Sequence, residues 1–580
     1  MNNTEKDISF RDLFLPLTVK KIILILCIVG LVIYFNMLFN GFVWDDLTYI
    51  INNPEIKNFN IISLFGQNSF NSSGYFRPIP AVYFSALFNL FGGTAFFYHF
   101  MQLTLHIVST TLLFFILKNF FKKNIAFVLS LLFLIHPINV ESVAYIGASQ
   151  SELLFLFGGL SFLLSVKEKL KIKTIFSIHL LLLLAILTKE VSFLFFVMVY
   201  FYRFLFKKGI TKQFAITTIA TLSVYLMIRF FSLGTLLEKM HLIPISRVPF
   251  HERLLHIPAI FFYYIKTFFF PLNLAIDQIW VIKKIDFNNF YFPLLIDFLF
   301  FGAITYFLFY LFKNKNKMWR LFAFFLIWYL LGMSMLLQIF PLDMTVADRW
   351  FYFPFVGLLG MMGVGFSYFW SYISKHKTFF ISSLILVCLM LSARTVIRNA
   401  NWLNPLVLYS HDLVGYDNYD LENFLAAELV MFNRFDEALP HLQKAVRLLP
   451  HDTNLFNLGT VYEHFNKFDE AKKYYKLALD SNDDYSNHSQ IRTLASEGWA
   501  RMTLMHDTPE KGKEVIKERL KEFPKSGTLW AYLAIAEYNL KNQKEAEAAA
   551  NTSMKFLNNP TTNLLYKKIV NNEPLNLKLR

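Results

Sequence analysis

Cysteine is almost absent from this sequence, and charged residues are scarce. Only Cys27 and Cys388 occur in 580 residues, and both lie inside apolar runs, which argues against a structural disulfide or a cysteine-based metal site. Charged residues make up 17% of the chain and hydrophobic residues 55%. A chain of this length is too apolar for a soluble protein with a single core. We therefore expect a membrane protein that carries an additional domain.

Motifs for nucleotide and cofactor chemistry are also missing. The sequence contains no Walker loop, no Gly-x-Gly-x-x-Gly pattern after a strand, no nucleophile elbow and no Cys-x-x-Cys pair. Nothing therefore supports nucleotide hydrolysis or cofactor-dependent redox chemistry. The formal net charge of +15 does not indicate a nucleic-acid partner either. The excess lies in short loops between apolar runs, while acids and bases roughly balance from about residue 400 onward.

Apolar runs long enough to cross a bilayer fill the first two thirds of the chain. The basic clusters between them indicate cytoplasmic loops. These clusters are Arg11/Lys20/Lys21, Lys118/Lys122/Lys123, Lys167/Lys169/Lys171/Lys173, Lys207/Lys208/Lys212, Lys313/Lys315/Lys317/Arg320 and Lys375/Lys377. About eleven spans alternate consistently with these loops: 22–39, 96–117, 124–137, 152–166, 174–188, 190–206, 214–232, 291–311, 319–339, 353–371 and 378–393.

This arrangement places the N-terminus in the cytoplasm, with the first run as an uncleaved signal anchor. The run 254–270 breaks the alternation if it crosses, so we expect it to be a re-entrant or interfacial helix. With an odd number of crossings, everything after Leu391 lies on the non-cytoplasmic side. That side is the periplasm in a bacterium or the lumen of the endoplasmic reticulum in a eukaryote.

Two neighbouring carboxylates, Asp45 and Asp46, follow the first run directly. A run from Ile22 to Phe39 reaches ~27 Å at ~1.5 Å per residue, so both side chains emerge just beyond the far membrane face. Such a pair can provide a general base, hold a divalent cation, or mark a solvated helix end. The segment 52–93 is expected to be a long outer loop that ends in an amphipathic stretch.

Several other ionisable residues are expected on the same outer side. They are Arg77, His136, Glu141, Lys189, Glu190, Asp348 and Arg349. Arg349 and Arg77 suit a phosphate at headgroup level, because a guanidinium matches phosphate oxygens with two parallel hydrogen bonds.

Each of these residues also has a structural interpretation. Both arginines could be interfacial anchors, and Arg349 could pair with Asp348. His136 and Glu141 could ligate a metal, but their spacing is no standard zinc motif, and hydrogen bonding across a turn is the alternative. Lys189 and Glu190 could simply neutralise each other.

From Tyr419 onward the sequence repeats with a period in the mid-thirties, which predicts tetratricopeptide (TPR) repeats. The phrases Asn433–Ala438 and Asn466–Ala471 share a polar turn, an aromatic residue, an acid and Glu-Ala, and Leu458-Gly459 occupies the small-residue position of a first helix. A third unit ending at Pro524 is degenerate, and a fourth carries Trp530. The alternative is a generic helical bundle. We therefore predict an all-α protein with a membrane module at 1–400 and a TPR solenoid at 401–580.

The order of these motifs resembles a known family. Phe42-Val43-Trp44-Asp45-Asp46, Phe76-Arg77-Pro78-Ile79, His136-Pro137 with Glu141-Ser142-Val143-Ala144, Lys189-Glu190 and Asp348-Arg349 with Tyr352-Phe353-Pro354 precede the TPRs. This order is similar to that of the transmembrane-and-TPR (TMTC-like) proteins, which belong with the protein O-mannosyltransferases of the C-type glycosyltransferase (GT-C) fold. The TPR array here is shorter than the family's, and its third unit is poor.

The resemblance implies an integral-membrane glycosyltransferase. Such an enzyme takes mannose or another hexose from a polyprenyl- or dolichyl-phosphate donor and transfers it to a hydroxyl, typically of protein Ser or Thr, on the non-cytoplasmic side. It implies Asp45 as the base with Asp46 as its partner, Arg349 and Arg77 as candidates for the donor phosphate, and an acceptor protein bound by the TPRs. No cofactor is certain, and a divalent cation at Asp45 and Asp46 stays open.

Two other classes remain as alternatives. A non-catalytic membrane scaffold could use its TPRs to recruit envelope or secretory proteins, but an anchor needs one span and has no reason to retain a dozen ionisable residues near one lipid boundary. A transporter would carry charges near the bilayer midplane, where only His106 and His179 stand out.

Overall fold

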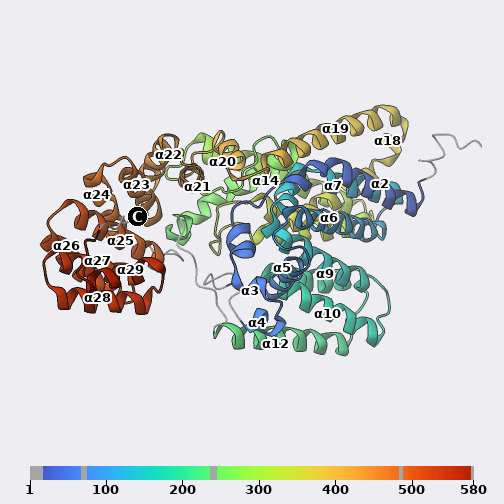
Figure 1. Ribbon diagram of the computed structural model, residues 1–580. Helices are drawn as coiled ribbons and strands as arrows, with labels where there is room; N and C mark the ends of the chain where they lie inside the picture. The colour runs from blue at the N-terminus through green and yellow to red at the C-terminus, as the bar shows by residue number, and fades with distance from the viewer. Residues whose placement is uncertain (1–16, 67–74, 235–243, 482–487, 576–580) are drawn as a thin grey trace, which may run out of the picture. The chain divides into compact units, whose positions relative to one another are not determined.

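The computed structural model describes residues 17–66, 75–234, 244–481 and 488–575. All regular elements in these ranges are helical, apart from one isolated bridge between Gln278 and Val346. The predicted all-α fold class is therefore confirmed. The chain divides into two compact units, residues 1–416 and residues 417–580, and each is described by itself (Figure 1).

The first unit contains nineteen described α-helices joined by short turns. They are α2 (Val19–Ile33), α3 (Pro54–Lys57), α4 (Ile61–Gly66), α5 (Pro78–Phe91), α6 (Ala95–Lys118), α7 (Lys123–Ile135), α8 (Val140–Ala144), α9 (Ser149–Ser165), α10 (Ile172–Thr188), α11 (Phe193–Leu205), α12 (Lys212–Leu233), α13 (Phe250–Arg253), α14 (Ile257–Phe269), α15 (Phe292–Lys313), α16 (Met318–Ser334), α17 (Tyr352–Tyr368), α18 (Trp370–Lys375), α19 (Lys377–Asn401) and α20 (Pro405–Leu413).

Each of the eleven expected spans falls on one of these helices. Six helical segments are long and apolar enough to cross a membrane, or seven if the bent pair α7 and α8 counts as one span. Their cores are α6, α9, α12, α15, α17 and α19. The other expected spans are helices of 13 to 17 residues, and for them, as for the interfacial role of α14, membrane crossing stays a prediction.

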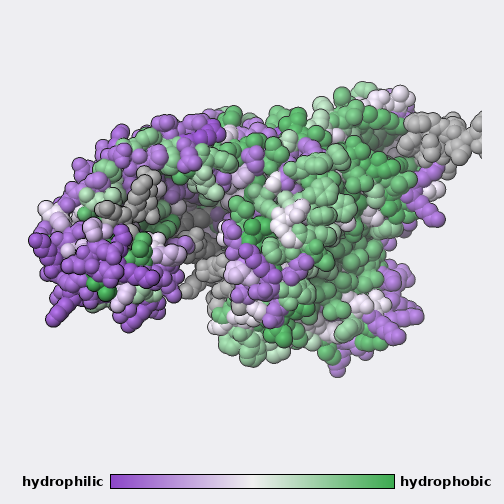
Figure 2. All heavy atoms as spheres, viewed as in Figure 1, coloured by the Kyte–Doolittle hydropathy of each residue, from purple (hydrophilic) through white to green (hydrophobic). Residues whose placement is uncertain are grey.

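The two kinds of long helix differ in what covers them. The apolar 18-residue stretches of α9 and α17 are 72% buried inside the protein. Those of α15 and α19 are only 11% and 6% buried. Close packing in the interior depends on small residues: a Cβ at Gly357 of α17 would come within 2.5 Å of the Tyr329 backbone nitrogen of α16. The exposed apolar side chains give the first unit its hydrophobic surface in Figure 2.

In residues 417–481 and 488–575, the second unit has four antiparallel helix pairs and a closing helix, as expected for a TPR solenoid. The helices are α21 (Tyr419–Met431), α22 (Phe435–Leu448), α23 (Asp452–His464), α24 (Phe468–Asp480), α25 (His488–His506), α26 (Pro509–Glu522), α27 (Gly527–Asn539), α28 (Gln543–Phe556) and α29 (Pro560–Val570).

The repeat phrases explain how these pairs form. Asn433 and Asn466 sit in equivalent turns with φ of 59° and 57°, a backbone conformation that asparagine tolerates better than most residues. A Cβ at Gly459 of α23 would lie 2.9 Å from the ring of Tyr475 of α24, so the small residue lets the two helices approach. Phe435 stacks on His464, and Phe468 stacks on His506 in the same way, which joins successive repeats.

The division between the units lies after Tyr416, not at the expected residue 400. The reason is a buried ion pair. Arg398 of α19 donates two hydrogen bonds, of 2.6 and 3.0 Å, to the carboxylate of Asp412 in α20. The backbone N–H of Ile276 donates to the same carboxylate at 2.8 Å, so α20 is part of the first unit.

Candidate active site

The two aspartates lie in a loop that is fastened to a distant part of the chain. After α2 and the turn Phe35–Phe39, the backbone N–H of Gly41 donates to the carbonyl of Leu403 at 2.9 Å. The amide of Asn40 donates to the carbonyl of Asn399 at 2.9 Å. The end of α19 therefore sets the position from which both carboxylates extend.

Asp46 is fully buried and bound to the backbone. One carboxylate oxygen accepts the N–H of Val43 at 3.1 Å, and the other accepts the N–H of Gly147 at 2.8 Å. A Cβ at Gly147 would come within 2.6 Å of the Tyr145 ring, so glycine is required there. Burial raises the pKa of Asp46 to about 8, against the effect of these hydrogen bonds. Asp46 therefore fixes the loop through both of its carboxylate oxygens.

Asp45 differs from its neighbour because its side chain is only half-buried. The hydroxyl of Tyr145 donates to one carboxylate oxygen at 3.3 Å. Burial raises the pKa of Asp45 to about 6, and the guanidinium of Arg349 and the Tyr145 hydroxyl limit the rise. Environments that push two neighbouring pKa values apart are typical of acid–base sites. At neutral pH, Asp45 is the ionised member of the pair.

Arg349 lies beside the aspartate loop although 300 residues separate the two in sequence. Its guanidinium carbon is 5.3 Å from the centre of the Trp44 ring and 5.9 Å from that of Tyr145. The side chain forms a buried ion pair with Glu141, whose carboxylate also accepts the Arg349 backbone N–H at 3.0 Å. The pairing with Asp348 that the sequence suggested is therefore replaced by one with Glu141.

Arg77, Lys189 and Glu190 form the other side of the same cluster. Arg77 is paired with Glu190 at 3.1 Å and donates to Gln150 at 2.8 Å. Lys189 does not neutralise Glu190 directly. Burial, Arg77 and Arg349 lower the pKa of Lys189 to about 7, while Asp343 and Glu190 oppose this effect. Lys189 makes no ion pair with any residue that the structure describes, so a positive charge here lacks a partner.

Two predicted residues lie at the edge of this cluster. His136 accepts the N–H of Ile138 at 3.2 Å, and its other ring nitrogen lies 2.9 Å from the carbonyl of Phe268. These contacts fit the turn-forming interpretation of His136. Asp348 accepts a hydrogen bond from Tyr263 of α14 and is buried beside Arg349. In the described part of the chain, neither side chain forms a hydrogen bond or an ion pair with Asp45.

A divalent cation at Asp45 and Asp46 stays a prediction. Both oxygens of Asp46 are taken by backbone N–H groups. Within the described ranges, no three His, Cys, Asp or Glu side chains lie close enough to share an ion. Mg²⁺ is commonly bound by one or two carboxylates together with waters and substrate phosphate, so Asp45 would be the available ligand if a cation enters with the donor.

Sequence reasoning did not assign a role to Tyr145, Gln150 or Asp343. The Tyr145 side chain contacts Asp45, Trp44 and Arg349. The negative charge of Asp343 raises the pKa values of Asp45, Lys189 and Arg349. Tyr145 and Gln150 lie in the same expected outer turn as Glu141. Their position in that turn was the feature of the sequence that could have marked them as site residues. Asp343 lies in the segment between α16 and α17, and its charge partners come from distant parts of the chain, which the sequence alone does not identify.

Comparisons with known proteins identify relatives of the chain. No protein-family model matches it. It is 24% identical to the human protein O-mannosyl-transferase TMTC3 over 80% of this chain and 55% of that protein. The mouse TMTC3 is 23% identical over 79% of this chain and 54% of that protein, and the protein O-mannosyl-transferase F38B6.6 of Caenorhabditis elegans is 29% identical over 161 residues.

The chain spans about half the length of the TMTC3 proteins that it matches. Its six candidate spans and these relatives make it a membrane protein. The resemblance first seen in the order of short motifs is confirmed by these alignments, which extend across most of the chain. Over most of its length, the chain is therefore homologous to the protein O-mannosyl-transferases of the TMTC group.

Proposed function

We propose that the protein is an integral-membrane glycosyltransferase with Asp45 as its general base. The proposed reaction moves mannose or another hexose from a polyprenyl- or dolichyl-phosphate donor to a Ser or Thr hydroxyl of a protein. One observation carries the proposal: the partly buried carboxylate of Asp45 is within electrostatic reach of the Arg349 guanidinium, which lies 5.3 Å from the ring of the neighbouring Trp44. The printed names of the homologues support the same class of reaction.

The chemistry assigned to Asp45 is proton removal. The acceptor oxygen attacks the anomeric carbon of the sugar while its proton passes to the Asp45 carboxylate. The bond between the anomeric carbon and the phosphate oxygen breaks, and the lipid phosphate leaves with the electron pair. A well-placed base contributes about 10²–10⁴ in rate. Because Asp46 is held by Val43 and Gly147, its role is to fix the loop that carries Asp45.

The cations on the other side of the cluster suit the leaving phosphate. Lys189 has no ion-pair partner among the described side chains, and a nearby phosphate would favour its charged form. Arg349 is oriented by Glu141 and Arg77 by Glu190, so both guanidinium groups are held in fixed positions. Negative charge grows on the phosphate as the bond breaks, so fixed cations stabilise the transition state more than the ground state.

The remaining parts of the proposal concern location and partners. We assign the reaction to the non-cytoplasmic side, in the periplasm or the lumen of the endoplasmic reticulum. The TPR unit is proposed to bind the acceptor protein. The lipid-linked sugar is the donor substrate, and no further cofactor enters the mechanism.

A transfer assay with purified protein tests the proposal. Detergent-solubilised protein is given radiolabelled mannosyl-phosphoryl-polyprenol and a Ser/Thr-rich peptide. We expect labelled peptide from the wild type, and for Arg349→Ala a KM for the donor about tenfold higher or more, because a charged hydrogen bond is lost. Arg447→Ala in the TPR unit is the matched control and leaves that KM unchanged. An unchanged donor KM for Arg349→Ala would remove this residue from the site, and no labelled peptide from the wild type would contradict the function.

A further inference from the structure

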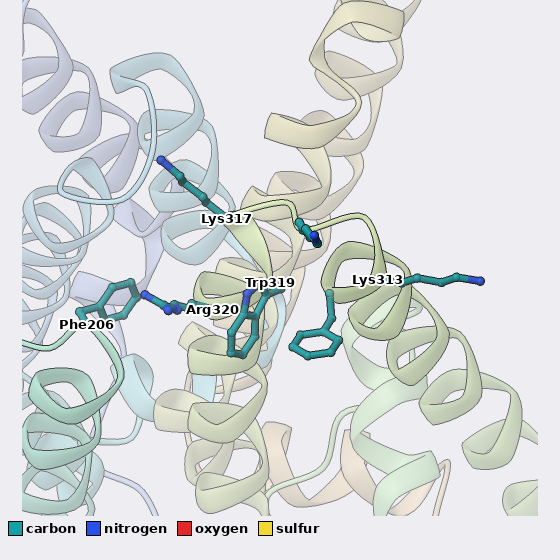
Figure 3. A pocket seen from close by; sticks show the side chains of 7 residues that line it. Phe206, Lys313, Lys317, Trp319 and Arg320 are labelled. Atoms are coloured by element: carbon teal, nitrogen blue, oxygen red, sulfur yellow. The ribbon is translucent and has the colours of Figure 1, made fainter.

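A hollow lined by basic and aromatic side chains lies at one end of the hairpin formed by α15 and α16. It measures about 660 Å³ and is open to the outside. Its walls include the basic residues Lys313, Lys315, Lys317 and Arg320 and the aromatic residues Phe206, Phe312 and Trp319 (Figure 3). No acidic side chain lines it. The hollow therefore has the charge of an anion-binding site.

This hollow is separate from the candidate active site. It is built from the last turn of α15, the first turn of α16 and the end of α11. Arg349 instead follows the far end of α16. Because α15 has 22 residues, ~33 Å at ~1.5 Å per residue separates its two ends. That is about the thickness of a bilayer's hydrocarbon core, so the two sites belong to opposite membrane faces.

The four cations of the hollow have no acid beside them. None of them forms an ion pair with a residue in the described ranges, and Arg320 has only its stacking over Trp319, at 5.6 Å from guanidinium carbon to ring centre. The turn holds them together, since the N–H of Lys315 donates to Phe312 and that of Asn316 donates to Leu311. All four cations lie between residues 313 and 320, and a bound anion lowers the electrostatic free energy of this concentration of positive charge.

The surface next to the hollow indicates where such an anion comes from. The side chains of Phe309 and Phe312 on α15 are 59% and 56% exposed. Only 11% of the apolar stretch of α15 is buried in the protein. In a membrane these rings contact acyl chains. An aromatic belt with basic side chains at the end of a span lies at headgroup depth. A soluble phosphate would gain nothing from this apolar surface, whereas a phospholipid contacts both.

We propose that this hollow binds the phosphate headgroup of an anionic phospholipid whose acyl chains lie along α15. The simpler interpretation is that these lysines only orient the loop, as basic residues do in many membrane proteins. A second group of basic residues serves as a control that distinguishes the two interpretations. Lys169 and Lys171, between α9 and α10, and Lys173, in the first turn of α10, are exposed, are expected on the same face, and line no part of the hollow.

The test measures which lipids the full-length protein retains. Wild-type protein, Lys313→Gln/Lys317→Gln/Arg320→Gln and the control Lys169→Gln/Lys171→Gln/Lys173→Gln are purified from membranes into detergent. Each is mixed with equimolar phosphatidylglycerol and phosphatidylcholine, and bound lipid is counted by native mass spectrometry. We expect the wild type and the control to favour phosphatidylglycerol about tenfold or more, and the hollow variant to lose most of this preference. Equal preference in both triple variants would overturn the proposal.

A second measurement does not depend on the triple variant folding. Tryptophan fluorescence of wild type and of Trp319→Phe is recorded in vesicles that contain phosphatidylglycerol or phosphatidylcholine with brominated acyl chains. The difference between the two proteins isolates Trp319, and we expect stronger quenching by the brominated phosphatidylglycerol. Equal quenching by both lipids would contradict a selective site. If inorganic phosphate abolishes the preference at millimolar concentration, the ligand is free phosphate and the lipid assignment is wrong.

Discussion

Charged side chains serve different purposes in the two units. In the first unit the pairs Arg349–Glu141 and Arg398–Asp412 are almost completely buried, and Arg349 and Glu141 are 208 residues apart in sequence. In the TPR unit, Arg434–Glu437 and Lys472–Asp469 are local i,i+3 pairs with exposed carboxylates. Burying a charge is costly, and surface pairs contribute little. The difference teaches that buried pairs in the first unit hold distant segments together, and that Arg349 is held beside the aspartate loop in this way.

The strongest test of this difference between the units is to neutralise one carboxylate in each of them. Asp45→Asn should lower the transfer rate about 10²–10⁴-fold, because the amide cannot accept the acceptor's proton at neutral pH. Asp469→Asn in the TPR unit removes an exposed carboxylate and should leave the rate unchanged. Both are measured as initial rates with saturating donor. Retention of more than about a tenth of the rate by Asp45→Asn would refute the base assignment.

The same contrast should be visible in stability. Glu141→Gln leaves the Arg349 guanidinium buried without its counter-charge and should lower the free energy of unfolding by about 3–5 kcal/mol. Glu437→Gln breaks an exposed pair and should leave the free energy of unfolding almost unchanged. Denaturant unfolding in detergent, followed by circular dichroism, measures both. Equal losses would mean that the buried pair has no special role.

Helix packing offers a third comparison. Gly357→Ala places a methyl group against the backbone of α16, which cannot move without its whole helix, and should cost about 1–3 kcal/mol. Gly459→Ala meets the ring of Tyr475, which can shift by a few tenths of an ångström, so the loss should be smaller. Melting temperatures of the two variants decide the point. A larger loss for Gly459→Ala would contradict the tighter packing assigned to the membrane unit.

The pH dependence of transfer distinguishes the two neighbouring aspartates. Asp45 acts as a base only when unprotonated, and its pKa is raised to about 6, so the rate should fall about tenfold per unit as pH drops below 6. Because the Arg349 guanidinium lowers the pKa of Asp45, Arg349→Gln should move the midpoint of this profile to higher pH. Rates are compared between pH 5 and 8. A flat profile down to pH 5 would be inconsistent with Asp45 as the base.

Hydropathy predicted where the helices lie, because each helix carries its own apolar run. The expected span 96–117 differs from α6 by one residue at each end. The span 378–393 falls short of α19, which continues to Asn401. There the helix turns polar, and Arg398 is buried by its pairing with Asp412, a contact that hydropathy cannot detect.

The arrangement of the site was only partly accessible from the sequence. The order of motifs pointed to Asp45, Asp46, Arg77 and Arg349, because each follows or precedes an apolar run on the same expected side. The pairing of Arg349 with Glu141 could not be predicted, since it depends on how helices far apart in sequence pack. Nor could the sequence separate Asp45 from Asp46. Their different roles follow from one hydrogen bond donated by Gly147, about a hundred residues away.

The central claim is that this chain transfers a sugar through Asp45, and one measurement tests it most directly. Proteins from the periplasm or the lumen are analysed by mass spectrometry in cells that lack the chain, express it, or express Asp45→Asn at the same level. We predict hexose on Ser or Thr residues that appears only with the wild-type chain. Identical modification with Asp45→Asn, or none with the wild type, would contradict the account and favour a scaffold.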